Sequence, residues 1–172
     1  MKKALIFLCL CMVMACEKGV QPGTTGATLS GDKADVAEAL IRRVFPPEAN
    51  RSNWPKVYCL GVFPFMDLDQ NFLNRFRDIA GVDILPLGQC TTTNAGTLVR
   101  KSDQAPAVFF EVDSIPFISP DSAMGAAGFV CGNLCGQGCE YGLKKVAGKW
   151  NVVSQGVCWI SYLIRKMMLM VA

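Results

Sequence analysis

The chain contains no histidine. Ser-His-Asp triads, Cys-His nucleophile pairs, HExxH zinc sites and histidine general bases are therefore all excluded.

No Asp or Glu follows Glu140, whereas five Lys and Arg residues do, and such a basic ending is typical of an edge hairpin that lysines keep soluble. The apolar run at Ala4–Val13 is ten residues long, half of the about 20 residues that a membrane-spanning helix needs.

The overall charge is also small. The sequence has 17 Lys and Arg against 14 Asp and Glu, a formal net charge of +3. Lys2 and Lys3 belong to a segment that we expect to be cleaved, which leaves 15 basic and 14 acidic side chains in residues 16–172. This balance lacks the basic excess of a nucleic-acid-binding protein, so we expect no nucleic-acid partner.

The first 16 residues have the pattern of an export signal that ends in a cysteine. Lys2 and Lys3 form a short positive region, and the apolar run follows it. The sequence Val13-Met14-Ala15-Cys16 resembles the lipobox of bacterial lipoproteins, commonly Leu-Ala/Ser-Gly/Ala-Cys. Ala15 matches that pattern, Val13 is a tolerated variant and Met14 departs from it. The competing interpretation is an ordinary secretory signal cut at another small residue.

The resemblance implies that Cys16 is the lipidated residue and that signal peptidase II cuts before it. Two or three acyl chains such as palmitate would then hold the protein on a lipid bilayer, because each buried CH₂ contributes about 0.8 kcal/mol. In Gram-negative lipoproteins an Asp after the cysteine favours the inner membrane, so Glu17 favours the outer one. The expected location is the cell envelope of a bacterium, with an envelope protein as a further partner.

Length and composition predict one folded domain behind this signal. We expect a signal peptide at residues 1–15, a flexible tether at 16–31 with four glycines and no aromatic residue, and a single domain at 32–172. The apolar tail at residues 166–172 is too short to span a membrane, so we expect it to pack on the sheet or fray.

Hydrophobic periodicity predicts two helices followed by strands. Helices are expected at residues 32–45 and 67–80, with Asp67 as the cap of the second. Short strands are expected at 56–63, 82–87, 97–101, 106–118, 123–130, 139–146, 149–154 and 157–163, with a two-residue turn at 147–148. The predicted fold class is α+β, with the two N-terminal helices on an antiparallel sheet.

Six cysteines remain after the signal and the lipidated position: Cys59, Cys90, Cys131, Cys135, Cys139 and Cys158. An even number in an exported domain favours disulfides, although six cysteines allow fifteen connectivities. The hairpin register places Gln137 opposite Cys158 and Cys139 two residues away, which makes a Cys139–Cys158 bond plausible.

The pairing of the other four cysteines is inferred from their positions in the chain. A bond between Cys59 and Cys90 would close a long loop around the second helix and add about 3–4 kcal/mol. Cys131 and Cys135 would then pair with each other. A competing interpretation is a metal or redox module at Cys131, Cys135 and Cys139, but their CxxxCxxxC spacing differs from the CxxC of zinc and thioredoxin sites. No metal ligands and no cofactor are assigned.

The run CGNLCGQGCEYGLKKVAGKWNV resembles the ending CGxLCGxGxxYxLxKxxGKWxV of uncharacterised exported proteins and lipoproteins of bacteria. Its Gly-Lys-Trp-x-Val hairpin also resembles the last strands of nuclear-transport-factor-two-like domains. The first resemblance covers about 35 residues of the chain. Neither resemblance carries an activity, so Cys16 is the only residue whose role is transferred.

The predicted function is therefore a non-enzymatic binding or assembly component of the envelope. The expected contact surface is the Gly/Cys-rich stretch 132–138 together with the aromatic residues Phe129, Tyr141, Trp150 and Trp159. The alternative is a histidine-free enzyme that uses a thiol or the carboxylates of Glu111, Asp113 and Glu140. No catalytic residue is assigned.

Overall fold

The computed structural model describes residues 26–64, 66–132 and 135–160. The predicted signal peptide, Cys16, most of the predicted tether and the apolar tail lie outside these ranges. None of the helices in the described residues is long and apolar enough to span a membrane.

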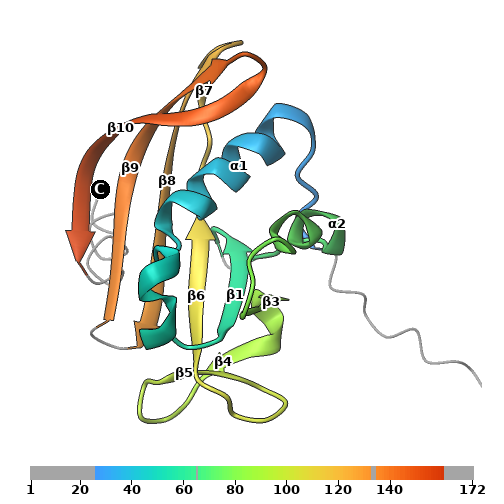
Figure 1. Ribbon diagram of the computed structural model, residues 1–172, viewed down its shortest axis with the longest axis vertical. Helices are drawn as coiled ribbons and strands as arrows, with labels where there is room; N and C mark the ends of the chain where they lie inside the picture. Colours follow the sequence, from blue (N-terminus) through green and yellow to red (C-terminus); the bar gives the residue numbers. More distant parts are fainter. Residues whose placement is uncertain (1–25, 65, 133–134, 161–172) are drawn as a thin grey trace, which may run out of the picture.

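One large twisted sheet organises the described chain (Figure 1). Its path runs β10-β9-β8-β6-β1-β2, and β3 pairs with β1 while β7 pairs with β8. The strands of this sheet are β1 (Val57–Val62), β2 (Met66–Asp67), β3 (Asp83–Pro86), β6 (Ala107–Val112), β7 (Phe117–Ser119), β8 (Ser122–Gly132), β9 (Cys135–Val146) and β10 (Lys149–Ile160). A separate two-stranded sheet joins β4 (Cys90–Thr92) to β5 (Leu98–Arg100).

The strand directions correct the predicted fold class. β1 is parallel to both β3 and β6, whereas the pairs β6–β8, β8–β9 and β9–β10 are antiparallel. The sheet is therefore mixed, and the prediction of two N-terminal helices on an antiparallel sheet is wrong. The suggested nuclear-transport-factor-two-like arrangement, which was part of the same prediction, is therefore also wrong. Parallel pairs need long crossover connections, and no local pattern in the sequence specifies which strands those connections bring together.

The first helix is confirmed as α1 (Gly31–Val44). Its apolar stripe of Val36, Leu40 and Ile41 is fully buried against the sheet, and each of these side chains contributes about 1.5–3 kcal/mol by leaving water. Figure 1 shows α1 crossing one face of the sheet. Lys145 of β9 holds its first turn through an ion pair of 2.6 Å with Asp32.

The second predicted helix is mostly absent. The regular part is one turn, α2 (Gln70–Leu73), continued by the 3₁₀ turn η2 (Asn74–Phe76). Its cap is Asp69, whose Oδ1 accepts a hydrogen bond from the Phe72 amide at 2.9 Å. Asp67 instead belongs to β2, and its carboxylate accepts a hydrogen bond from the Gly88 amide. The predicted apolar face is nevertheless buried, because Phe72 and Phe76 pack under α1 in the same core.

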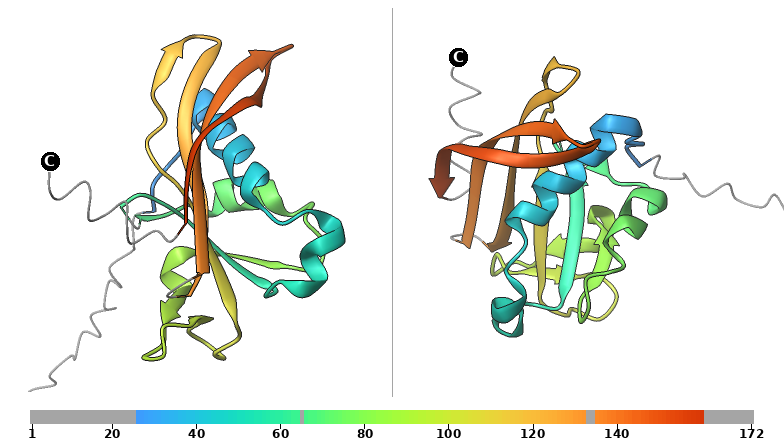
Figure 2. Two further views of the ribbon diagram at one scale, coloured as in Figure 1. Left: turned by 90° about the vertical axis from the view of Figure 1, so that its left-hand side faces the viewer. Right: turned by 45° about the horizontal axis from the view of Figure 1, so that its top comes forward.

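The two helices share one side of the sheet (Figure 2). On the other side, a smaller core lies between β1, β6 and the β4–β5 sheet, with η3 (Leu87–Gln89) leading into β4. Another 3₁₀ turn, η1 (Glu48–Asn53), joins α1 to β1. The disulfide between Cys59 of β1 and Cys90 of β4 ties this smaller core together, with the two Cα atoms 6.4 Å apart.

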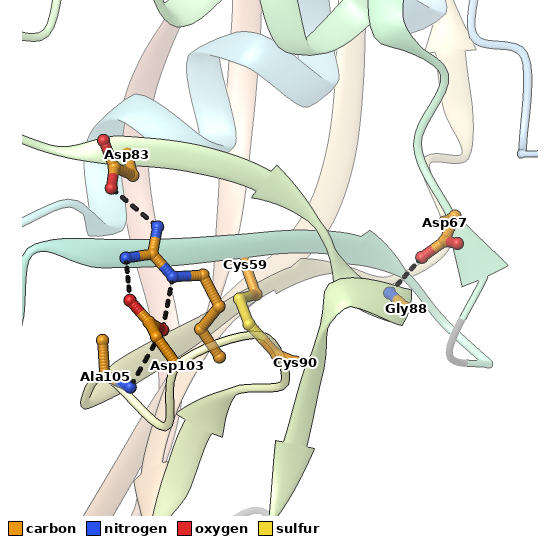
Figure 3. The surroundings of a disulfide bond; sticks show 8 residues. Cys59, Asp67, Asp83, Gly88, Cys90, Asp103 and Ala105 are labelled. Carbon is orange, nitrogen blue, oxygen red and sulfur yellow. Dashed lines mark hydrogen bonds and ion pairs between the residues drawn. A yellow bond between two sulfur atoms is a disulfide. The ribbon is translucent and has the colours of Figure 1, made fainter.

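Arg100 stabilises the same region through two carboxylates, Asp83 and Asp103, which are labelled in Figure 3. Its guanidinium pairs with Asp83 at 2.8 Å and with Asp103 at 2.7 Å. The Asp103 carboxylate also accepts a hydrogen bond from the Ala105 amide at 3.2 Å. The pKa of Asp103 is lowered to about 2, chiefly by its hydrogen bond with Arg100 and secondly by the hydrogen bond from the Ala105 amide.

The β9–β10 hairpin forms as predicted around a turn at Ala147 and Gly148, both with positive φ. Near the turn the register is the predicted one, with Trp150 opposite Lys145. Two irregularities farther along then shift β10, so that Cys158 lies directly opposite Cys139. β-Bulges of this kind insert extra residues into one strand. They remove the two-residue offset between Cys139 and Cys158, which form a disulfide with their Cα atoms 4.1 Å apart.

Three other predicted strands are divided differently in the structure. The predicted strand 106–118 is two strands, β6 and β7, while the predicted strands 149–154 and 157–163 form the single strand β10 within the described residues.

Candidate ligand-binding cavity

A cavity of about 230 Å³ lies where the C-terminal end of α1 meets the sheet. Its lining comes from α1 and from strands β8, β9 and β10. In Figure 1 the C-terminal end of α1 lies over β8 and beside β9. The lining residues are Arg43, Val44, Ala127, Phe129, Gln137, Gly138, Cys139, Tyr141 and Gln155.

The floor of the cavity is apolar and rigid. Ala127 of β8 and Cys139 and Tyr141 of β9 are buried, and Phe129 is half-buried. Their side chains point toward α1 because residues at every second position of a strand share one face of the sheet. The disulfide from Cys139 to Cys158 links β9 to β10 at this point. Two cross-linked strands under a packed helix form a preformed surface for an apolar group.

The rim of the cavity is polar. Arg43, Gln137 and Gln155 are exposed at its edge. The Arg43 Nη2 lies 3.4 Å from the Gln155 Oε1 and donates to it. The Gln155 Nε2 lies 3.1 Å from the Cys158 Sγ, so the amide is held between the guanidinium and the disulfide.

Arg43 differs from the other arginines that hold this domain together. Arg42, one residue earlier, pairs with Glu38 at 2.8 Å and with Asp78 at 2.9 Å. Arg75 pairs with Asp35 at 2.7 Å and with Glu38 at 2.9 Å. These pairs fasten α1 to the segment after α2.

No carboxylate of the described residues lies within 4.0 Å of the Arg43 guanidinium, and the residues that line the cavity include no Asp or Glu. Within the described part of the chain, the cavity therefore contains one cation and no carboxylate to balance its charge.

Tyr141 is the other ionisable group in the lining. Burial raises the pKa of its phenol, and the nearby positive charge of Arg43 opposes that shift in part. The phenol therefore stays protonated at neutral pH. It can donate a hydrogen bond to a ligand, and it is not a general base under these conditions.

The predicted contact surface is only partly brought together. Phe129, Tyr141 and Gly138 line the cavity, whereas Trp150 lines a different groove, between the hairpin turn and the exposed side of α1. Trp159 lies against Gly138, because a Cβ built on that glycine would come within 2.6 Å of the indole. Cys139 faces the cavity, so this indole occupies the opposite face of the sheet.

Of the rim residues, Gln137 falls in the predicted stretch 132–138, whereas Arg43 and Gln155 are absent from the sequence-based prediction. Arg42 and Arg43 both fall in the last turn of α1, where basic residues complement the helix dipole, so the local sequence gives the two arginines the same role. Their roles separate because they point in different directions from α1: Arg42 faces Glu38 and Asp78, and Arg43 faces β10. Helical spacing predicts that adjacent side chains point about 100° apart, but it does not show which of the two arginines meets a carboxylate.

The six cysteines pair as the sequence analysis favoured: Cys59 with Cys90, Cys131 with Cys135 and Cys139 with Cys158. The metal or redox alternative required Cys131, Cys135 and Cys139 to act as one group. In the structure Cys139 is bonded to the other strand of the hairpin. The described residues include no group of three or more side chains that could hold a metal ion.

The carboxylates of the enzyme alternative lie on strands that are not neighbours. Glu111 is buried on β6, and Asp113 follows the same strand. Glu140 is on β9, and β8 lies between β6 and β9. Glu140 lines a groove on the sheet face away from α1, and neither Glu111 nor Asp113 is among the residues that line that groove. This arrangement gives no support to a paired-carboxylate site.

Comparisons of the chain with protein-family models, with curated proteins and with solved structures find no match.

Proposed function

We propose that this chain is a lipid-anchored protein of the bacterial cell envelope whose domain binds a small molecule in the cavity between α1 and strands β8–β10. The observation that carries the binding proposal is the composition of that cavity. It combines a buried apolar floor with a few polar groups that converge at the rim, which is the usual character of a ligand site.

The same lining favours binding over catalysis. Its cysteine, Cys139, is oxidised in the disulfide with Cys158 and provides no free thiol. Its phenol, Tyr141, has a raised pKa. Its remaining polar side chains are a guanidinium and two amides. Nucleophilic and acid–base mechanisms need a group that gains or loses a proton near neutral pH, and these side chains do not.

The position of the cavity suits a domain that is tethered at its N-terminus. The described chain enters the fold beside β2, where the Ala27 amide donates to the Asp67 carbonyl at 2.6 Å. β2 and β10 are at opposite ends of the sheet path. A tether at the β2 edge would therefore leave the cavity accessible to ligands from the aqueous side.

The lipid anchor is tested by maturation in a bacterial host fed with labelled palmitate. The wild-type protein should incorporate label and partition into a detergent phase, and Cys16→Ser should do neither. Cys9→Ser is the matched control, because it removes a cysteine from the apolar run and leaves the lipobox-like sequence intact. Equal labelling of Cys16→Ser and the wild type would exclude the anchor.

The binding proposal is tested by filling the cavity. Val44 lines it, and Val44→Trp should occupy the space that a ligand needs. Val146→Trp adds the same bulk at an exposed position on the hairpin. Protein isolated from the envelope would be denatured and its small-molecule extract compared by mass spectrometry. A compound enriched with the wild type and with Val146→Trp, and lost with Val44→Trp, supports the proposal. Identical extracts from all three proteins would refute it.

A further inference from the structure

We propose, building on the proposed binding function, that the ligand is a small organic carboxylate and that Arg43 is the residue that recognises its charge. Arg43 is the one side chain of the lining that is charged at neutral pH, since Tyr141 remains a neutral phenol there. A neutral ligand would leave this charge without a counter-ion. A cationic ligand would be repelled by it.

The geometry leaves a bonding edge of the guanidinium available. A guanidinium has five N–H donors in a planar fork. The bond that the described residues supply to the Arg43 side chain is the single contact from Nη2 to the Gln155 Oε1. Because the Gln155 amide also contacts Cys158, its oxygen is kept toward Arg43 and orients the fork. Two parallel N–H donors can then bind both oxygens of a carboxylate.

The floor of the cavity selects for an acid that carries an apolar body. Ala127, the half-buried Phe129 ring and the disulfide provide an apolar contact surface below the rim. Inorganic phosphate could meet Arg43 but would leave this surface unused. The volume of about 230 Å³ limits the body to a few carbon atoms or a single ring. The charge would stay at the rim, where both ions keep part of their hydration and the cost of burying a charge is small.

Benzoate and benzamide are matched probes for this inference, because they have the same ring and nearly the same shape and differ in charge. Binding would be measured by chemical-shift titration of the disulfide-intact domain. Arg43→Gln removes the charge from the cavity. Arg77→Gln is the control, since Arg77 is exposed, lies after η2 and is not part of the lining.

The expected result is that benzoate binds to the wild type and to Arg77→Gln, with shifts at Phe129 and Tyr141, and that benzamide binds at least about tenfold more weakly. Arg43→Gln should lose about tenfold or more in benzoate affinity, the size expected of a charge-assisted hydrogen bond. It should leave benzamide binding unchanged. Added salt should weaken benzoate binding to the wild type more than benzamide binding.

Three results would overturn the inference. One is equal affinity of benzoate and benzamide, the second is retention of benzoate binding in a folded Arg43→Gln protein, and the third is tighter binding of inorganic phosphate than of benzoate. Each of them could occur while the extracts of the Val44→Trp experiment still show a bound compound. The proposed function would then stand and the carboxylate assignment would fall. The spectrum of ligand-free Arg43→Gln verifies that the variant is folded.

Discussion

The contact between α1 and β8 gives a quantitative test of how the helix is seated. Leu40 is fully buried, and a Cβ built on Gly125 of β8 would lie 2.7 Å from its Cδ1 atom. The glycine therefore makes room for the leucine. Leu40→Ala should destabilise the domain by about 2–5 kcal/mol, because it removes buried carbon atoms and leaves a cavity. Gly125→Ala should cost about 1–3 kcal/mol by overpacking the same contact.

The double variant distinguishes this explanation from independent effects. In Leu40→Ala/Gly125→Ala the new methyl group occupies part of the space that the leucine vacates. The total loss should therefore be smaller than the sum of the single losses by about 1–2 kcal/mol, a coupling typical of residues in contact. Leu98→Ala/Gly125→Ala is the control pair, since Leu98 belongs to the other core. Its two effects should add.

The assay is urea unfolding of the disulfide-intact domain, followed by tryptophan fluorescence. All variants should show the same dependence of the free energy on denaturant, so that midpoints report stability directly. If the Leu40 and Gly125 effects add to within about 0.5 kcal/mol, then the two residues do not share the contact and α1 is seated differently from the structure described here.

Three further outcomes are expected. Because the pKa of Tyr141 is raised in the folded protein, the folded state holds the phenol proton more tightly than the unfolded state does. The stability that this protonated phenol contributes is complete below the unfolded pKa of about 10 and is lost as the pH rises above that value. Tyr141→Phe should make the alkaline loss of stability shallower, and an unchanged slope would contradict this. Asp103 should titrate in carboxyl NMR near its pKa of about 2, and Arg100→Gln should return it toward about 3.9, whereas no change would show that Arg100 is not the cause. Replacing both Cys59 and Cys90 by Ala should lower the free energy of unfolding by about 2–4 kcal/mol, measured against the wild type under the same oxidising conditions, and an equal midpoint would show that the bond constrains nothing.

Much of the local structure was predictable because it depends on neighbours in the sequence. The period of Val36, Leu40 and Ile41 predicted α1 and its buried stripe, and Ala147-Gly148 predicted the hairpin turn. Periodicity also identified which residues after Asp67 would be buried. It could not show that the regular helix ends within one turn, because that depends on how the segment connects β2 to β3.

The candidate site was predictable only in part. Phe129 and Tyr141 were expected on a contact surface and do line the cavity. Arg43 could not be singled out, because its difference from Arg42 consists of contacts with distant segments. Arg42 meets Asp78, and Arg43 meets Gln155. An arginine without a carboxylate partner becomes apparent only after the partners of the other arginines are known.

Local patterns of a few adjacent residues were enough to predict the first helix and the hairpin, and composition alone gave the even number of cysteines after Cys16. The export signal and the lipidation of Cys16 stay predictions from a pattern of the same local kind. The tertiary structure decided the parallel pairing of β1 with β3 and β6, the bulges that bring Cys158 opposite Cys139, and the isolation of Arg43 at the rim of a cavity. The physical reason is that strand order, register shifts and charge pairing are properties of contacts between segments far apart in the chain, and their energies exist only when those segments meet.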